Sequence, residues 1–166
     1  MELWDLYRSD RSLAGIDHIR GEPIHQGLYH LAVHVWIKNS RGQYVISQRS
    51  ADRPSYPLWW ECVGGSVVKG EDSRTGAVRE AFEEVGIMLD PEKGRLVFSR
   101  VREKQQDILD VWLFFYDGEI RLDQAPTREV AQSRWMEAAE IEALLESGKL
   151  VPTLSYFFTE IHGQFP

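Results

Sequence analysis

The sequence contains a single cysteine, Cys62, among its 166 residues. One thiol cannot form an internal disulfide, and it cannot supply the several thiolates of a cysteine-built zinc site. No window approaches the roughly 18 apolar residues that a membrane-spanning helix needs. The opening residues, MELWDLYRSD, have neither a basic start nor an apolar run, so we expect no secretory signal. These absences predict a soluble, cytoplasmic protein without a membrane partner.

Positive charge is also scarce. Lys and Arg number 19 against 26 Asp and Glu, and the formal net charge is −7. An acidic surface without a basic patch does not attract nucleic acid, so we expect no DNA partner. Hydrophobic residues make up 43% of the chain and include six Trp, seven Phe and six Tyr, which is enough for a packed core. We therefore predict one domain over residues 1–166.

The pattern of apolar residues predicts a mixture of strands and helices. Residues 1–28 are broken by glycine and proline, which indicates an N-terminal arm or hairpin. Strands and helices do not alternate strictly, so we expect an α/β sandwich around a mixed sheet. The expected strands are Tyr29–Ile37, Gln43–Arg49, Arg95–Val101, Ile108–Tyr116 and Ala131–Met136.

Three helices are expected. The first begins at Asp72 or Ser73, whose side chains can cap it, and ends at Gly86. Its apolar stripe, which we expect to pack on the sheet, comprises Ala77, Val78, Ala81, Phe82 and Val85. The second helix covers EAAEIEALLESG at 137–148, and the third covers PTLSYFFTEIHGQF at 152–165.

The first helix carries an unusual concentration of charge. Glu80, Glu83 and Glu84 are spaced i, i+3 and i+4, so a helix stacks them on one side, opposite the apolar stripe. Like charges at this spacing repel, and a solvated acidic face is the ordinary explanation of such a run. A hard divalent cation reverses the repulsion, because carboxylate oxygens are the ligands that Mg²⁺ and Mn²⁺ prefer. The glutamates therefore suit a metal and a diphosphate substrate.

The surrounding residues strengthen this interpretation. The segment GGSVVKGEDSRTGAVREAFEEVGI resembles the signature of the Nudix hydrolases, G-x5-E-x7-R-E-U-x-E-E-x-G-U, where U is a bulky aliphatic residue. The match runs from Gly65 to Ile87, and it departs from the signature at Ala81, a small residue at a U position. The resemblance implies a Nudix-type α/β/α sandwich. It also implies hydrolysis of a diphosphate linked to another group, X, with Mg²⁺ or Mn²⁺.

The resemblance assigns roles within this box. It implies that Glu80 and Glu84 are the principal metal ligands and that Glu83 reaches a metal directly or through water. The supporting positions that it implies are Glu71, Gly65 and Arg79, with the backbone carbonyl of Gly64 as a further ligand. We expect a Mg²⁺-dependent hydrolase that cleaves a nucleoside diphosphate-X or a related organic diphosphate.

The general base is less clearly marked. A carboxylate must take the proton of the attacking water, and Glu83 and Glu84 are candidates within the box. Glu129, six residues before Trp135, is a third candidate, because some family members carry such a glutamate before a similar Trp-Met pair. A surface glutamate is the alternative interpretation of Glu129.

Two other functions remain as alternatives. The order of segments also resembles the isopentenyl-diphosphate isomerase branch of the superfamily. That isomerase needs a cysteine where this chain has Gly64, and Cys62 lies two residues too early. The second alternative is a non-catalytic diphosphate-binding module, which the complete set of box glutamates disfavours.

Three residues are candidates for contact with the substrate. Arg49 could contact phosphate, and Trp59 or Trp60 could stack on a base or wall a pocket, although one of the two is expected in the core. His30 and His34 share one face of their strand, where we expect hydrogen-bonded histidines in preference to a metal pair. Nucleotides, sugar nucleotides, dinucleotides, capped RNA and prenyl diphosphates all remain possible. The arm LWDLY favours a homodimer, or else covers its own sheet edge.

Overall fold

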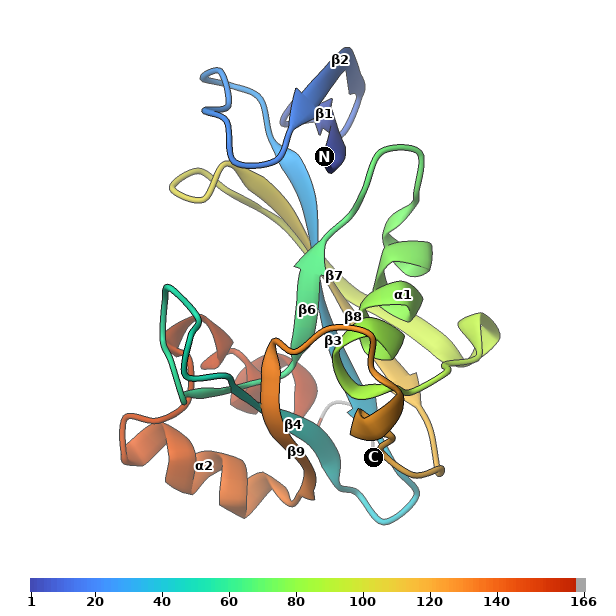
Figure 1. The fold of residues 1–166 in the computed structure, drawn as a ribbon, viewed down its shortest axis with the longest axis vertical. Helices are drawn as coiled ribbons and strands as arrows, with labels where there is room; N and C mark the ends of the chain where they lie inside the picture. Colours follow the sequence, from blue (N-terminus) through green and yellow to red (C-terminus); the bar gives the residue numbers. More distant parts are fainter. Residues whose placement is uncertain (164–166) are drawn as a thin grey trace.

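The computed structural model describes residues 1–163, which are arranged around one twisted sheet (Figure 1). The long strand β3 (His30–Lys38) pairs in parallel with β8 (Asp107–Phe115), and β8 pairs antiparallel with β7 (Gly94–Arg102). The sheet is therefore mixed, as predicted. The strands on the other side of β3 are β4 (Tyr44–Arg49), β5 (Trp60–Glu61) and β9 (Val130–Met136), of which β5 and β9 both pair with β4.

One edge of β3 is shared by two strands. β6 (Val63–Ser66) pairs with the first half of β3, with Gly64 opposite His34, whereas β4 meets its end at Lys38↔Tyr44. Neither β6 nor the two-residue β5 was predicted from the sequence. Glycines have low strand propensity, and the segment VGGS is a strand through its pairing with β3. This fork in the sheet places a glycine backbone beside the first helix.

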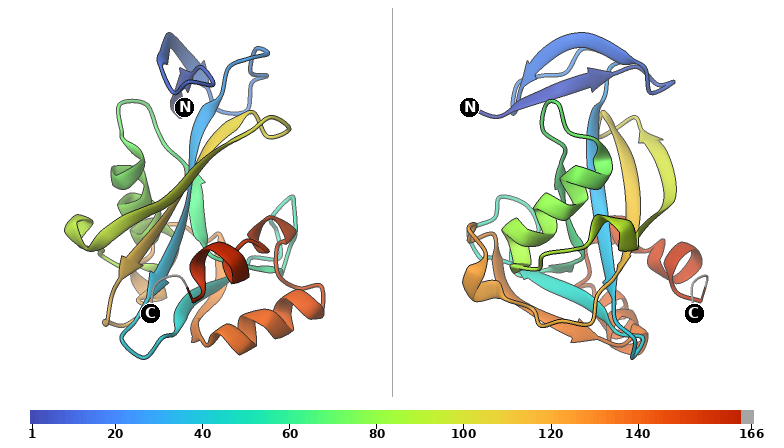
Figure 2. Two further views of the ribbon diagram at one scale, coloured as in Figure 1. Left: turned by 180° about the vertical axis from the view of Figure 1, so that it is seen from behind. Right: turned by 90° about the vertical axis from the view of Figure 1, so that its right-hand side faces the viewer.

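The two faces of the sheet are covered by different elements. The right-hand view of Figure 2 shows α1 (Ser73–Val85) on one face and the C-terminal segment on the other. Successive side chains of β3 point to opposite faces. Val33 and Val35 belong to the core under α1, and Ala32 and Trp36 to the core that includes α2 (Ala138–Glu146). The predicted sandwich is confirmed.

Helix α1 has the predicted ends. The Asp72 carboxylate accepts a hydrogen bond from the backbone N–H of Thr75 at 2.8 Å, and Gly86 follows the helix with φ 68°, a left-handed conformation that favours glycine. The predicted apolar stripe is wrong at Phe82, which is 37% exposed, because it lies a further 100° around the helix from Ala81. Glu84 is buried, so the alternative of a solvated acidic face does not hold at this residue.

The N-terminal segment is a hairpin, one of the two forms expected. Strands β1 (Leu3–Tyr7) and β2 (Leu13–Ile19) form a separate two-stranded sheet at the top of Figure 1. The hairpin is hydrogen-bonded to the loop before α1, where the Lys69 N–H donates to the Leu3 carbonyl at 2.8 Å and the Gly70 N–H donates to the Asp5 carboxylate at 2.8 Å. The hairpin therefore braces the loop that carries Glu71.

The C-terminal half of the chain follows the prediction only in part. Helix α2 is present within its expected range, and a capping box between Glu137 and Glu140 begins it. The third helix is wrong in form: the segment contains a 3₁₀ turn at Pro152–Leu154 and a π turn at Phe157–Ile161. Residues 164 and 165 of its predicted range lie outside the described residues. Further 3₁₀ turns cover Pro91–Lys93 and Leu122–Gln124. Among residues 1–163, no helix has the length and hydropathy needed to cross a membrane.

Candidate active site

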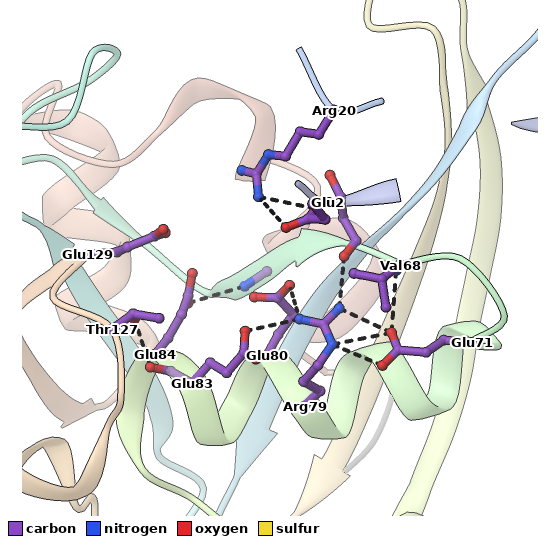
Figure 3. Close-up of polar contacts among 12 residues, drawn as sticks. Glu2, Arg20, Val68, Glu71, Arg79, Glu80, Glu83, Glu84, Thr127 and Glu129 are labelled. Atoms are coloured by element: carbon purple, nitrogen blue, oxygen red, sulfur yellow. Dashed lines mark hydrogen bonds and ion pairs between the residues drawn. The ribbon is translucent and has the colours of Figure 1, made fainter. Parts of the chain in front are cut away.

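Arg79 is the centre of the polar network in Figure 3. Its Nε donates to Glu71 at 3.0 Å, and its Nη1 donates to Glu80 at 2.8 Å and to Glu83 at 3.0 Å. Its Nη2 donates to the Ser66 carbonyl at 2.9 Å. Burial opposes the charge of Arg79, but its hydrogen bond to Glu71 and the charge of Glu80 raise the pKa of the guanidinium above its usual value. One cation thus joins the box loop, α1 and β6.

Glu84 has a different environment. Its side chain comes from the last turn of α1 toward β6, where it is 6% exposed and accepts a 3.4 Å hydrogen bond from the Gly64 N–H. Burial raises the pKa of Glu84 well above its usual value, and the charges of Glu61, Glu80 and Glu129 raise it further. No arginine pairs with this carboxyl in the described chain. Its ionised form therefore lacks a cation partner.

Glu80 lies against the backbone of β6. A Cβ at residue 65 would stand 2.4 Å from the Glu80 carboxyl carbon, so only glycine allows this approach. Burial raises the pKa of Glu80, and Arg79 opposes this shift. The glycine of the box thus has a specific steric role, which is to let β6 and the carboxylate meet.

These carboxylates surround a small cavity, which we call the carboxylate cavity, of about 100 Å³. Glu129 lies beyond Glu84 as seen from Arg79 (Figure 3), and it pairs with Arg53 at 2.8 Å. The Thr127 hydroxyl donates to the Glu83 carbonyl at 2.7 Å, which holds the Glu129 loop against α1. The hairpin also reaches the cavity. The full lining is Glu2, Arg20, Arg53, Gly64, Gly65, Ser66, Arg79, Glu80, Glu83, Glu84, Thr127 and Glu129.

The donor set suits a hard divalent cation, since five of the lining groups are carboxylates. Within residues 1–163, no three carboxylate, imidazole or thiol groups are already close enough together to hold a metal ion. Glu80 and Glu83 each give Arg79 one oxygen and keep the second free. Glu80, Glu83, Glu84 and Glu129 are the lining residues that could hold a cation.

A second, larger space, which we call the side pocket, lies next to the carboxylate cavity and has a volume of about 430 Å³. Its floor is the face of β3 opposite α1, carrying His30, Ala32 and His34. Arg53 and Glu84 line both spaces, as do the three β6 residues Gly64, Gly65 and Ser66. The other lining residues are Val33, Arg49, Ser55, Glu61, Cys62, Arg102, Asp107, Thr153 and Leu154. The two spaces therefore meet at the glycine backbone and the buried Glu84.

Two residues that line the side pocket, Glu61 and Arg53, were not singled out from the sequence. Glu61 pairs with Arg49 at 2.6 Å. Burial raises the pKa of the Glu61 carboxyl, and the charge of Arg49 opposes this rise. Arg49 also donates to the Ser55 carbonyl at 2.9 Å, so the structure places this predicted phosphate contact in a structural pair. Arg53 borders both spaces, and its buried Nε has no hydrogen-bond partner among the described residues. The sequence offered one indication of Arg53, which is a second arginine only four residues after Arg49.

The remaining candidates lie in other surroundings. Trp60 is buried with Arg134 over its ring, and Trp59 packs on Tyr56; neither tryptophan lines the two spaces. Cys62 is buried, as expected, and burial raises the pKa of its thiol. His34 is hydrogen-bonded, as expected, and burial lowers the pKa of its imidazole to about 3.

Comparison with known proteins identifies the family. The NUDIX domain family matches residues 28–157. An uncharacterised Nudix hydrolase of Listeria monocytogenes, lmo0368, is 40% identical over 159 residues, which cover 95% of this chain and 91% of the relative. An isopentenyl-diphosphate Δ-isomerase of Shigella flexneri is 31% identical over 65 residues, 39% of this chain and 36% of that protein. The crystal structure of DR0079 from Deinococcus radiodurans superposes with a TM-score of 0.71 at 22% identity, covering 90% of this chain and 92% of that one.

The chain belongs to the Nudix family. It is a Nudix hydrolase by its family match and relatives, and the structural likeness to DR0079 supports the fold. The family supports hydrolysis of the pyrophosphatase type on small, nucleoside diphosphate-linked molecules.

Proposed function

We propose that this protein uses Mg²⁺ or Mn²⁺ to hydrolyse the diphosphate linkage of an organic diphosphate, with water as the attacking group. The observation that carries the proposal is the arginine-centred network beside a buried carboxyl. Arg79 holds Glu71, Glu80 and Glu83 within 3.0 Å while Glu84, one turn further along, is left without a cation. A site that needed only stability would gain by replacing a buried unpaired carboxylate with an apolar group.

The ligands that we propose are Glu80, Glu83 and Glu84, with the Gly64 carbonyl beside them. A divalent ion bound there would neutralise diphosphate charge and make water more acidic. Arg79 fixes the orientation of the glutamates, and Glu71 in turn fixes Arg79. Gly65 supplies the space in which Glu80 approaches β6.

A carboxylate at the cavity wall would take the proton of the attacking water. Glu83, Glu84 and Glu129 all face this cavity, so all three stay candidates. Glu129 is the one whose partner, Arg53, could transfer to a substrate phosphate, because Arg53 borders both spaces. Release of Glu129 would leave its carboxylate free to accept a proton.

The isomerase alternative is not favoured by the site. The side chain that isomerase chemistry requires is replaced by Gly64, and the thiol of Cys62 is buried with a raised pKa. Homodimer formation and a cytoplasmic location remain predictions, and light scattering would test the first. A purely binding role is disfavoured by the retention of every box glutamate.

Phosphorus NMR tests the proposal directly. The purified protein would be incubated with Mg²⁺ or Mn²⁺ and a nucleoside diphosphate sugar, a nucleoside triphosphate, a dinucleotide or isopentenyl diphosphate. We expect the diphosphate resonances of one class to disappear as monophosphate resonances appear, and excess chelator to stop the change. Turnover that is unaffected by chelator, or a moved double bond in isopentenyl diphosphate, would contradict the proposal.

A further inference from the structure

The side pocket contains a histidine that the proposed chemistry does not use. His34 lies at the centre of β3, opposite Gly64 in the β3–β6 register, and its ring lines the pocket. A Cβ at residue 64 would stand 3.3 Å from His34 Cδ2, so the ring edge faces the glycine backbone where the two spaces meet. Any substrate that extends from the carboxylate cavity into the side pocket passes this ring.

Hydrogen bonds behind His34 determine which nitrogen carries its proton. Trp36 Nε1 donates to the Tyr156 hydroxyl at 2.9 Å, and this hydroxyl lies 2.8 Å from His34 Nδ1. An indole N–H can only donate, so the tyrosine oxygen accepts from Trp36. The Tyr156 hydroxyl still has its own proton to donate, and His34 Nδ1 is the one other hydrogen-bond partner of this hydroxyl in the described chain. Because a buried hydroxyl proton without an acceptor costs free energy, the hydroxyl donates to His34 Nδ1.

The direction of the chain is therefore from Trp36 to Tyr156 to His34. An Nδ1 that accepts a hydrogen bond carries no proton, so the ring is neutral and its proton is on Nε2. The Tyr156 ring lies parallel to the His34 ring, with centroids 5.9 Å apart, and Phe98 packs edge-on against Tyr156. Aromatic packing thus holds the hydroxyl in place behind the histidine.

The rest of the pocket indicates what this donor would meet. His30 and His34 are four residues apart on β3, so the floor is roughly 13 Å long. Near its far end, Arg102 is held by two hydrogen bonds to Asp107, at 2.8 and 2.6 Å. His30 has a buried Nδ1 without a partner among residues 1–163. An isoprenoid chain placed here would remove water from these groups without replacing its hydrogen bonds.

Aromatic recognition is also missing from this pocket. None of its described lining residues is Trp, Tyr or Phe, so no large ring is available on which a nucleobase could stack. Polar groups are present along its whole length. This lining suits an oxygen-rich, hydroxylated group of sugar character.

We propose that the side pocket binds a hydroxylated, sugar-like X group and that His34 donates a hydrogen bond from Nε2 to an oxygen of X close to the diphosphate. Tyr156 is the positioning residue that fixes the tautomer. This inference rests on the proposed function, because it assumes that the diphosphate occupies the carboxylate cavity.

Nitrogen-15 NMR of histidine-labelled protein tests the tautomer without any turnover. We expect the His34 signals, assigned by their loss in His34→Gln, to show a proton on Nε2 and none on Nδ1. In Tyr156→Phe the signals should move toward a mixture of tautomers. Protonation at Nδ1 in the wild type, or unchanged signals in Tyr156→Phe, would overturn the relay.

Ligand addition tests the class of X. With Ca²⁺ present, we expect ADP-ribose to shift the His34 Nε2 signal and geranyl diphosphate to leave it in place. The reverse result would overturn the assignment of a sugar-like X. A His34 shift without hydrolysis in any phosphorus experiment would refute the proposed hydrolysis and preserve this inference, so the two failures are distinguishable.

Kinetics on the compound that is consumed add a matched pair of variants. His34→Phe keeps a flat ring but has no donor, whereas the amide nitrogen of His34→Gln stands near the place of Nε2. We expect kcat/KM to fall about tenfold in His34→Phe and to recover to within about threefold of the wild type in His34→Gln. Equal losses in two variants that both retain the wild-type unfolding temperature would contradict donation to the substrate.

Discussion

The two spaces beside β6 are built in opposite ways. Three carboxylates of the carboxylate cavity, Glu80, Glu83 and Glu84, come from one helix, and Arg79 of the same helix binds two of them. The side pocket combines β3 with residues far along the chain, such as Arg102 and Leu154. The first is rich in negative charge, whereas the second mixes arginines, histidines and acids. Under the proposed function, the groups that act in the reaction come largely from a local stretch of sequence, whereas the groups that select the substrate are brought together by tertiary structure.

Loss of the Glu84 carboxylate should have the largest effect on the carboxylate cavity. Glu84→Gln keeps the size of the side chain but removes its charge, so a metal would be bound weakly and the candidate base would be lost. We expect kcat to fall by about a thousandfold or more, measured by phosphorus NMR with Mg²⁺.

Glu142→Gln is the matched control for this change. Glu142 is an exposed glutamate on α2 that lines neither space, so its loss should leave kcat unchanged. If Glu84→Gln keeps more than a tenth of the wild-type rate, Glu84 is neither an essential metal ligand nor the general base. The carboxylate cavity would then not differ from the side pocket in its role in the reaction.

The junction between the spaces should show a smaller effect, in KM. Arg53 has a buried Nε without a partner in the described chain and borders both spaces. If it transfers from Glu129 to a phosphate oxygen, Arg53→Ala should raise KM by roughly 10- to 100-fold, the usual worth of a charge-assisted hydrogen bond. Arg134→Ala removes an exposed arginine outside both spaces and should leave KM unchanged. Equal KM values in the two variants would exclude Arg53 from substrate binding.

Arg49 should behave differently from Arg53, although the two arginines are only four residues apart at the end of β4 and in the loop that follows it. Arg49 and Glu61 form a largely buried pair at 2.6 Å. Arg49→Ala leaves the carboxylate of Glu61 without its partner, and we expect the free energy of unfolding to fall by about 2 kcal/mol. Urea denaturation at pH 7.5 measures this change. A double variant, Arg49→Ala with Glu61→Gln, should recover part of the loss, and a failure to do so would show that the pair is not the cause.

The same contrast between local and distant contacts explains which features could be predicted from the sequence. Helix α1, its Asp72 cap and its Gly86 end depend on neighbours within a few residues, and a local pattern is sufficient to predict them. The His34–Tyr156 bond spans 122 residues of sequence and Arg49–Glu61 spans a change of strand. No local pattern marks such partners. Strand β6 was missed for the same reason, since only its pairing with β3 makes VGGS a strand.

The smallest expected effect concerns stability in the absence of metal. Burial raises the folded-state pKa of Glu84 above its ordinary value of 4.5. A carboxyl whose pKa is higher in the folded than in the unfolded state stabilises the fold at pH values below its unfolded-state pKa. This stabilisation is lost as the pH rises through the folded-state pKa, because the carboxyl must then ionise in a buried position. The neutral amide of Glu84→Gln does not undergo this loss. The variant that is least active should therefore be the more stable at neutral pH.

Differential scanning calorimetry in excess chelator tests this sign. We expect Glu84→Gln to unfold a few degrees above the wild type at pH 7.5, since about 1 kcal/mol corresponds to roughly 3 °C in a chain of this size. The difference should shrink toward zero near pH 4.5, where the wild-type carboxyl is protonated. Glu142→Gln should track the wild type at both pH values. If the wild type is more stable than Glu84→Gln at pH 7.5, the ionised Glu84 already has a stabilising partner within the protein. The buried charge of the carboxylate cavity would then be explained by the fold alone, without a bound ligand.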